Sequence, residues 1–167
     1  MRAKAANKHC RQMLATILDF PYPTVACITG HTFGGGCPFA LSHDYIVMNS
    51  SRGYFCMPPV RLGLSFPGIG TLPRLKLRPA VARKMLLEAH QFTADEALED
   101  GVIHAKGKPE EILSLAVGIA QKWAVMGKAG VYGVLRDELY GEASQALKRL
   151  SYVHARNTNV GKARMQL

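Results

Sequence analysis

The chain has 167 residues, of which 48% are hydrophobic, with a mean hydropathy near zero and a formal net charge of +9. This length fits one domain with a real core, no apolar run approaches the roughly 20 residues of a membrane span, and the four cysteines lack the CxxC spacing of a zinc site. The composition favours a soluble intracellular protein and disfavours a disulfide-stapled, metal-binding or membrane-spanning one.

The first half of the chain alternates helical and strand patterns. Apolar spacing predicts a helix over residues 5–19, and a β-branched apolar run predicts a strand over 24–29. A short helix is expected over 35–42, followed by a second strand over 45–48. The prolines and glycines between residues 58 and 73 then predict an irregular region that lines a cavity or a turn-rich surface.

Helical patterns dominate the second half. Helical periodicity returns over 79–89, and Thr93 with Glu96 forms a capping box for a helix that Gly101 ends. Further helices are expected over 109–126, 130–140 and 142–155. The one plausible break lies at 106–109, so we expect a core over residues 1–105 and a C-terminal helical region over 106–167. The apolar faces of that region are expected to join the core or to form an oligomer surface.

The most informative stretch of the sequence runs from Pro23 to Cys37. A β-branched apolar run ends at Gly30, and three consecutive glycines at 34–36 then open an apolar, helix-like segment. A helix start leaves backbone N–H groups without partners, and glycine removes the Cβ that would keep a ligand away from them. The pattern therefore fits a site for a carbonyl oxygen that becomes negatively charged during reaction. A tight structural turn would produce the same pattern.

Three blocks of sequence resemble the crotonase superfamily, which includes enoyl-CoA hydratases and isomerases. They are the glycine stretch with residues 40–45, the block 60–68 with 72–75, and the block 92–103. The resemblance spans residues 8–105. The segment Ser42-His43-Asp44-Tyr45 is most similar to the Δ3,Δ2-enoyl-CoA isomerase branch. It implies an α/β fold with a crotonase-like ββα spiral core that is truncated on its N-terminal side and ends in C-terminal helices.

The resemblance also implies the chemistry. In the family, two backbone N–H groups polarise a thioester carbonyl, and Gly35 matches the residue that supplies the second of them. The first belongs to a segment upstream of the helix at which this chain begins. The implied partner is an acyl-CoA thioester, with coenzyme A carried as part of the substrate, no other cofactor and no metal. A homo-oligomer, as a trimer or hexamer, is also implied, as is a peroxisomal or mitochondrial location, with the cytoplasm as the alternative.

The acid and base positions depart from the family pattern. Pro38 and Pro59 stand where hydratases carry glutamates, and no aspartate follows at residues 65–68. His31 is the candidate general base because an imidazole titrates near neutrality; the alternative is a loop residue that hydrogen-bonds to backbone. Asp44 is interpreted as a structural carboxylate. The catalytic candidates are thus Gly35 and His31, and the substrate-binding candidates are Phe33, Gly34, Pro38, Met57, Pro59, Arg61 and Leu64.

The excess positive charge is confined to one half of the chain. Residues 1–87 contain eleven lysines and arginines against two acids, Asp19 and Asp44, whereas residues 88–167 hold ten of each sign. A basic half with few carboxylates favours an anionic partner, such as the phosphates of coenzyme A or nucleic acid. Nucleic acid is disfavoured, since the sequence has neither an RNP-type aromatic signature nor zinc-finger spacing. The alternative to an anionic partner of either kind is that the positive charge reflects scattered, solvated lysines.

The sequence supports one leading function and two alternatives. The leading one is an enoyl-CoA isomerase or hydratase that acts on an unsaturated acyl-CoA through the glycine-loop oxyanion site, with altered acid and base residues. The first alternative is a catalytically degenerate subunit that binds acyl-CoA or pairs with a complete family member. The second is a tailoring isomerase or dehydratase of a specialised pathway.

Overall fold

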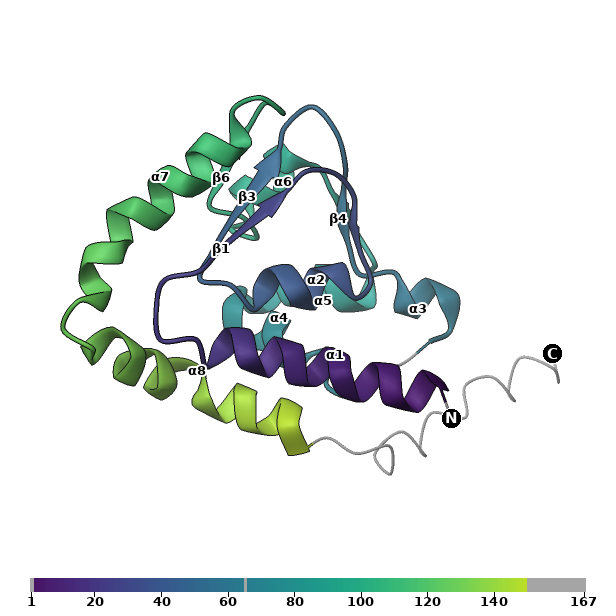
Figure 1. The fold of residues 1–167 in the computed structure, drawn as a ribbon. Helices are drawn as coiled ribbons and strands as arrows, with labels where there is room; N and C mark the ends of the chain where they lie inside the picture. Colours follow the sequence, from purple (N-terminus) through teal and green to yellow (C-terminus); the bar gives the residue numbers. More distant parts are fainter. Residues whose placement is uncertain (1, 65, 150–167) are drawn as a thin grey trace, which may run out of the picture.

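The computed structural model describes residues 2–64 and 66–149. Short strands alternate with helices as far as Gly107, and helices make up the rest of the described chain (Figure 1). In chain order the elements are α1 (Arg2–Leu18), β1 (Val25–Ile28), β2 (Thr32–Phe33), α2 (Gly36–Leu41), β3 (Tyr45–Asn49), β4 (Phe55–Cys56), α3 (Pro59–Leu62), α4 (Thr71–Lys76), α5 (Pro79–Leu87), β5 (Gln91–Phe92), α6 (Ala94–Glu99), β6 (Ala105–Gly107), α7 (Ile112–Ala124), the 3₁₀ helix η1 (Val125–Gly127) and α8 (Val131–Arg149).

Two three-stranded sheets form the strand part of the fold. In the first sheet β3 lies between β1 and β6, and all three strands run parallel, with Cys27 opposite Val47 and Val47 opposite Ala105. In the second sheet β4 lies between β2 and β5, parallel to β2 and antiparallel to β5. The chain passes from the first sheet to the second twice in succession, from β1 to β2 and from β3 to β4, so the two sheets wind as a spiral. The glycine loop therefore leaves an end strand of the second sheet and enters α2.

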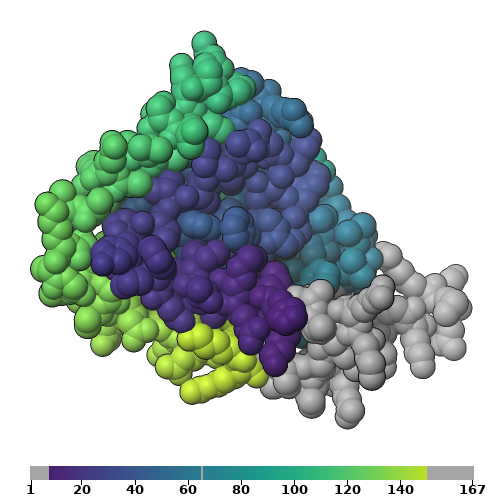
Figure 2. Space-filling view, viewed as in Figure 1, coloured from purple at the N-terminus to yellow at the C-terminus, as the bar shows by residue number. Residues whose placement is uncertain are grey.

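One hydrophobic core holds the sheets and most of the helices together. Met48, Phe55 and Phe92, from strands of both sheets, are completely buried in it. Each such side chain contributes about 1.5–3 kcal/mol to stability by leaving water. Ala143 and Leu147 of α8 belong to the same core, where α8 lies beside α1 (Figure 2). The C-terminal helix therefore helps to close the core that the strands begin.

The helix α7 covers one face of the first sheet. Val47, in the middle of β3, is buried against Ile112 and Ala116 of α7. At Gly107 of β6, an added Cβ would stand 2.5 Å from the Cδ1 atom of Leu115. Glycine at this position therefore permits the close contact between β6 and α7.

A buried ion pair ties α8 to the segments that flank β1. Arg136 of α8 and Asp44 have side chains that are 3% and 7% exposed, and Arg136 Nε lies 2.9 Å from Asp44 Oδ1. Asp44 also accepts a hydrogen bond from the backbone N–H of Thr24 at 2.7 Å. The guanidinium satisfies the C-terminal end of α1 as well, where it donates to the carbonyl oxygens of Ile17, Leu18 and Phe20. The interpretation of Asp44 as a structural carboxylate is thereby confirmed.

The C-terminal helices differ from the predicted ones. The sequence predicts two helices, over 130–140 and 142–155, but a single helix, α8, runs through Gly141 to Arg149. Gly141 is buried, and a Cβ there would stand 2.8 Å from a carboxylate oxygen of Asp137. The Asp137 side chain is exposed and can move aside, and the glycine does not break the helix. Residues 150–155 of the predicted helix lie outside the described residues, as does the rest of the predicted region to 167.

The capping residues in the sequence correctly predict where α6 begins and ends. The Thr93 side chain accepts from the Glu96 N–H, Glu96 accepts from the Thr93 N–H at 2.9 Å, and Gly101 follows α6 with φ +73°. The region expected to be irregular contains the short helices α3 and α4, and β2 lies where the sequence predicts a loop.

Within the part of the chain that the structure covers, no helix is both long enough and apolar enough to cross a bilayer.

Candidate functional site

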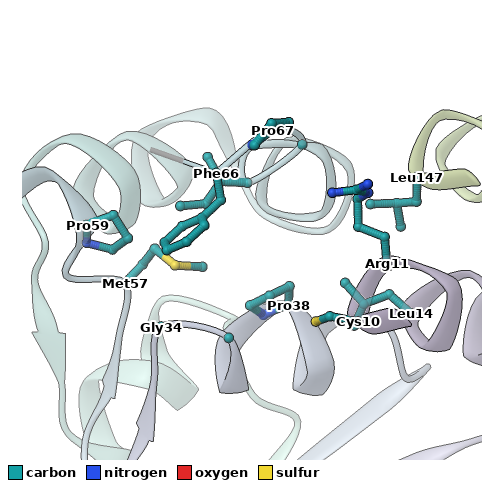
Figure 3. Close-up of a pocket in the computed structure, with 13 residues that line it drawn as sticks. Cys10, Arg11, Leu14, Gly34, Pro38, Met57, Pro59, Phe66, Pro67 and Leu147 are labelled. Atoms are coloured by element: carbon teal, nitrogen blue, oxygen red, sulfur yellow. The ribbon is translucent and has the colours of Figure 1, made fainter. Parts of the chain in front are cut away.

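An apolar cavity of about 290 Å³ lies where the glycine loop, the segment after β4, α1 and α8 meet (Figure 3). The loop and α2 contribute one side of it, and the segment after β4 contributes another. Five of the predicted site residues line this one cavity, namely Gly34, Gly35, Pro38, Met57 and Pro59. The remaining wall consists of Cys10, Arg11, Leu14, Phe66, Pro67, Gly68, Ile69 and Leu147. The expectation that the proline- and glycine-rich region lines a cavity is confirmed.

The glycine loop contains two glycines with different conformations. Gly34 has φ +55°, a left-handed conformation that favours glycine, and its N–H donates to the Cys56 carbonyl oxygen at 3.1 Å. Gly35 caps α2 with ordinary helical angles, φ −62° and ψ −21°. A Cβ built on Gly35 meets no atom within 4 Å. Neither the backbone conformation nor the packing of the described chain therefore requires glycine at position 35.

Buried contacts hold the loop in place. Cys37 is completely buried, and its sulfur lies 3.2 and 3.1 Å from the carbonyl oxygens of Thr32 and Cys56, which share its one S–H donor. Burial raises the pKa of the Cys37 thiol. A raised pKa disfavours the reactive thiolate form, and the contacts of Cys37 hold α2 against β2 and β4.

The cavity wall offers few groups that can move a proton. Among the described lining residues there is neither a carboxylate nor an imidazole. Pro38 and Pro59, which the motif resemblance places at the positions of the family's glutamates, both line the cavity, and proline cannot transfer a proton. No cluster of histidine, cysteine, aspartate and glutamate that could hold a metal ion occurs in the described ranges. This wall is therefore better suited to holding an apolar group than to acid–base chemistry.

A second depression, of about 450 Å³, follows β1 and contains His31. The centroid of the His31 ring lies 5.1 Å from that of Phe33 and 5.8 Å from that of Tyr54. His43 lines the same depression, donates from Nδ1 to the Phe39 carbonyl oxygen at 2.9 Å, and has a pKa lowered by burial. The two catalytic candidates, Gly35 and His31, thus line different depressions. The assignment of His31 as a general base stays a prediction.

Three predicted substrate-binding residues lie outside the lining of the apolar cavity. Phe33 is 45% exposed, next to the His31 ring, and Leu64 is 53% exposed. Arg61 is exposed and donates to the carbonyl oxygen of Glu88 at 3.3 Å. Contact of these side chains with a substrate stays a prediction.

Sequence reasoning missed the helical part of the wall. Arg11 and Leu14 come from α1 and Leu147 comes from α8, near opposite ends of the described chain. The one available signal is the spacing within α1. Arg11 stands three and four residues before the buried Leu14 and Ala15, so helical geometry puts it on the inner face.

The two sheets wind as a spiral, and a glycine loop and a short helix border an apolar cavity. This arrangement is typical of the crotonase class of α/β proteins. The model of the family described as enoyl-CoA hydratase/isomerase matches residues 2–164. The chain belongs to this family, and the resemblance found in its motifs is confirmed.

Enoyl-CoA delta isomerases of Arabidopsis thaliana are among the similar proteins. Enoyl-CoA delta isomerase 3 is 35% identical over 144 residues, which make up 81% of this chain and 59% of that protein. The peroxisomal enoyl-CoA delta isomerase 1 is 33% identical over 136 residues, 79% of this chain and 57% of that protein. A carnitinyl-CoA dehydratase of Salmonella paratyphi B is 30% identical over 146 residues, 86% of this chain and 54% of that protein. The chain spans a little more than half the length of these relatives.

Solved structures share the fold. The crystal structure of a probable enoyl-CoA hydratase from Mycobacterium tuberculosis superposes with a TM-score of 0.86 at 19% identity, covering 98% of this chain and 70% of that one. An enoyl-CoA hydratase from Mycobacterium marinum gives a TM-score of 0.80 at 21% identity, covering 98% of this chain and 68% of that one. At these identities the likeness shows the fold alone. It confirms the predicted crotonase-like α/β architecture.

Proposed function

We propose that the chain binds an unsaturated acyl-CoA with its acyl thioester in the apolar cavity and the thioester carbonyl oxygen at Gly35. The observation that supports this most strongly is the unoccupied volume beside Gly35. Gly35 has helical backbone angles, and an added Cβ would meet no atom within 4 Å. Nothing in the described chain therefore requires glycine at this position. Close approach of a ligand would require it.

The chemistry proposed for this position is stabilisation of an enolate-like intermediate. The helix α2 begins at Gly36, and a helix start has N–H groups without intrahelical partners. When a proton leaves the α-carbon of a thioester, negative charge develops on the carbonyl oxygen, and one backbone donor stabilises it by about 2.7–4 kcal/mol. Return of the proton at another carbon moves the double bond. His31, water or a group of the substrate is the proposed proton carrier.

The size and lining of the cavity favour a short acyl chain. Met57, Pro59 and Phe66 present apolar surface, and the volume of about 290 Å³ lies at the small end of ligand pockets, which range over about 300–1,000 Å³. Coenzyme A enters as part of the substrate, and its phosphates match the basic first half of the chain. No separate cofactor is proposed.

One observation favours a second function. Because the described lining has neither carboxylate nor imidazole, the cavity suits a catalytically degenerate subunit that holds acyl-CoA or pairs with a complete family member. A tailoring isomerase or dehydratase of a specialised pathway would use the same carbonyl site and differ in its substrate.

We also propose a homo-oligomer, as a trimer or hexamer. Within the described ranges, the outer strands of each sheet, β1 and β6 in the first and β2 and β5 in the second, pair with only one strand each, which leaves both edges of each sheet without a strand partner. Large apolar side chains are also exposed on α7 and α8, among them Leu113, Val117, Val134, Leu135 and Leu139. Another copy of the chain would cover such surfaces.

We propose a peroxisomal location, because two of the similar enoyl-CoA delta isomerases are named as peroxisomal proteins.

Calorimetric titration and turnover with 3-hexenoyl-CoA test the proposal together. Binding with conversion to the conjugated 2-enoyl thioester would support an isomerase. Binding without conversion would support the degenerate subunit. Absence of binding by protein that is folded by circular dichroism would refute both.

A further inference from the structure

His104 joins the start of β6 to β3 through two hydrogen bonds, one of which requires a neutral imidazole. Its backbone N–H donates to the Ile46 carbonyl oxygen at 2.8 Å, and the Ile46 N–H donates in return to His104 Nδ1 at 3.0 Å. A ring nitrogen accepts a hydrogen bond only when it carries no proton. Protonation at Nδ1 would therefore break the second bond and set two N–H groups against each other.

The charged groups around His104 also disfavour a proton on its ring. Burial of part of the ring and the positive charge of Lys76 in α4 lower the pKa of His104, and the negative charge of Asp44 only partly opposes them. Asp44 is already paired with Arg136 of α8, at 2.9 Å. His104 as a whole remains accessible to solvent, so protons reach it.

The other titratable side chains at this junction supply no counter-charge for a protonated His104. Lys106 of β6 and Asp95 of α6 form an ion pair with each other. Burial favours the neutral form of one histidine and three tyrosines near Asp44, since it lowers the pKa of the histidine and raises those of the tyrosines: His43, Tyr45, Tyr132 and Tyr140. A proton on His104 would thus add positive charge beside Lys76 and gain only the attraction of Asp44.

Few contacts hold the segment that follows His104 to the first sheet. β6 pairs with β3 over the three residues Ala105–Gly107. α7 lies beside β3 and β6 (Figure 1) and buries a small cluster, built on Val47, Ile112 and Ala116, that is separate from the main core. Units with few buried contacts open more readily than the core of a fold. Loss of the bond to His104 should therefore loosen β6 and α7 first.

An aromatic stack connects His104 to α7. The ring of His104 lies edge-on to that of Tyr45, with the centroids 5.2 Å apart. Tyr45 stacks in turn on Trp123 of α7, with the centroids 6.0 Å apart and the ring planes within 3°. Trp123 is the only tryptophan of the chain, so its fluorescence reports on this end of α7.

We infer that His104 is an acid-sensitive latch, whose neutral ring holds β6 and α7 against the first sheet and whose protonation at Nδ1 releases them. In the closed form its pKa lies below the value of about 6.5 for an exposed histidine. The latch therefore contributes its full stability above a pH of about 6.5 and loses it as the pH falls from there through the lower pKa of the closed form. His104 does not line the apolar cavity, so the latch does not depend on the proposed function.

Amide hydrogen exchange of the full chain at about pH 7.5 and about pH 5.5, followed by mass spectrometry, tests the latch. After correction for the intrinsic exchange rate, the wild type should lose protection by up to about tenfold over residues 45–49 and 105–124, while α5 in the main core keeps its protection. H104N should show no such loss, because the Oδ1 atom of asparagine can accept from the Ile46 N–H and does not titrate.

H43N is the matched control. Burial lowers the pKa of His43 as well, but its Nδ1 donates to the Phe39 carbonyl oxygen at 2.9 Å, and a second ring proton leaves that bond intact. Asparagine can donate to the same oxygen through its amide. H43N should therefore lose protection on acidification as the wild type does, and the fluorescence of Trp123 should shift to the red over the same pH range in both.

The wild type alone can overturn the inference, so the test stands even if H104N fails to fold. Constant protection over the two segments at both pH values, or an equal loss of protection in α5, would show that no local release occurs. A loss in H104N as large as that of the wild type would assign the acid sensitivity to another group. An unchanged Trp123 spectrum at acid pH would show that α7 stays in place.

Discussion

Replacing Gly35 with alanine separates the stability of the chain from its ability to bind a thioester. Gly35 has φ −62° and ψ −21°, which alanine adopts without strain, and the added Cβ meets no atom within 4 Å. The substitution therefore reduces the conformational freedom of the unfolded chain at no cost to the fold. We expect the free energy of unfolding to rise by about 0.4–1 kcal/mol. For a domain of this size that corresponds to an increase in Tm of about 1–4 °C.

The same methyl group would occupy the volume proposed for the thioester carbonyl. A carbonyl oxygen held away from its backbone donor loses a hydrogen bond, so we expect the affinity for 3-hexenoyl-CoA to fall at least about tenfold in calorimetry. Gly35→Val, with its bulkier branched side chain, should weaken binding further. Any turnover should fall by about 10²–10³-fold, as for the loss of an oxyanion donor.

Gly34→Ala is the matched control, one residue earlier in the same loop. Gly34 has φ +55°, so a side chain there is strained although its Cβ would also meet no atom within 4 Å. We expect it to lose about 1–2 kcal/mol of stability, the opposite sign to Gly35→Ala. A Gly35→Ala variant that is more stable and binds 3-hexenoyl-CoA as tightly as the wild type would remove the loop from the binding site. A destabilised Gly35→Ala would show that the backbone argument is wrong.

Other substitutions test the proton carrier, the buried ion pair and the assembly. If His31 is the proton carrier, His31→Gln should lower turnover by about 10²–10⁴-fold, as the loss of a general base does; a change of less than about tenfold would rule the assignment out. Arg136→Met leaves a buried carboxylate without its partner, and urea unfolding should show a loss of about 3–5 kcal/mol; a loss below about 1 kcal/mol would contradict this. Changing the exposed Leu135 and Leu139 together to glutamate should shift light scattering from oligomer to monomer with helix content unchanged. A wild type that is already monomeric at micromolar concentration would contradict the proposed assembly.

The fold could be predicted where its signals are local. Thr93 and Glu96 form a capping box from residues three apart, so the sequence contains the whole interaction. Gly141 was predicted to end a helix because glycine disfavours the helix interior by about 1 kcal/mol. The helix nevertheless continues through Gly141, which is buried, and α8 extends to Arg149. The strand β2 has only two residues, too few for a period-two pattern.

The site follows the same division between local and distant residues. Gly34, Gly35 and Pro38 are neighbours in one motif, and all three line the cavity. Arg11 and Leu147 meet this motif only after α1 and α8 pack together, which no motif in the sequence encodes. The sequence therefore predicted the glycine-loop side of the cavity and missed the side formed by the two helices.

The buried ion pair connects the helices that form the part of the cavity wall that the sequence did not predict. Arg136 joins α8 to the end of α1 and to Asp44, and these same two helices supply Arg11 and Leu147 to the cavity. A buried ion pair often adds little net stability, because the attraction between the charges only offsets the loss of their hydration. We expect its main effect to be on geometry, because Arg136 connects α8 to the end of α1 and both helices line the cavity. Arg136→Met should therefore weaken binding of 3-hexenoyl-CoA even at temperatures where the variant stays folded. Unchanged affinity in the folded variant would show that the cavity wall keeps its position without the pair.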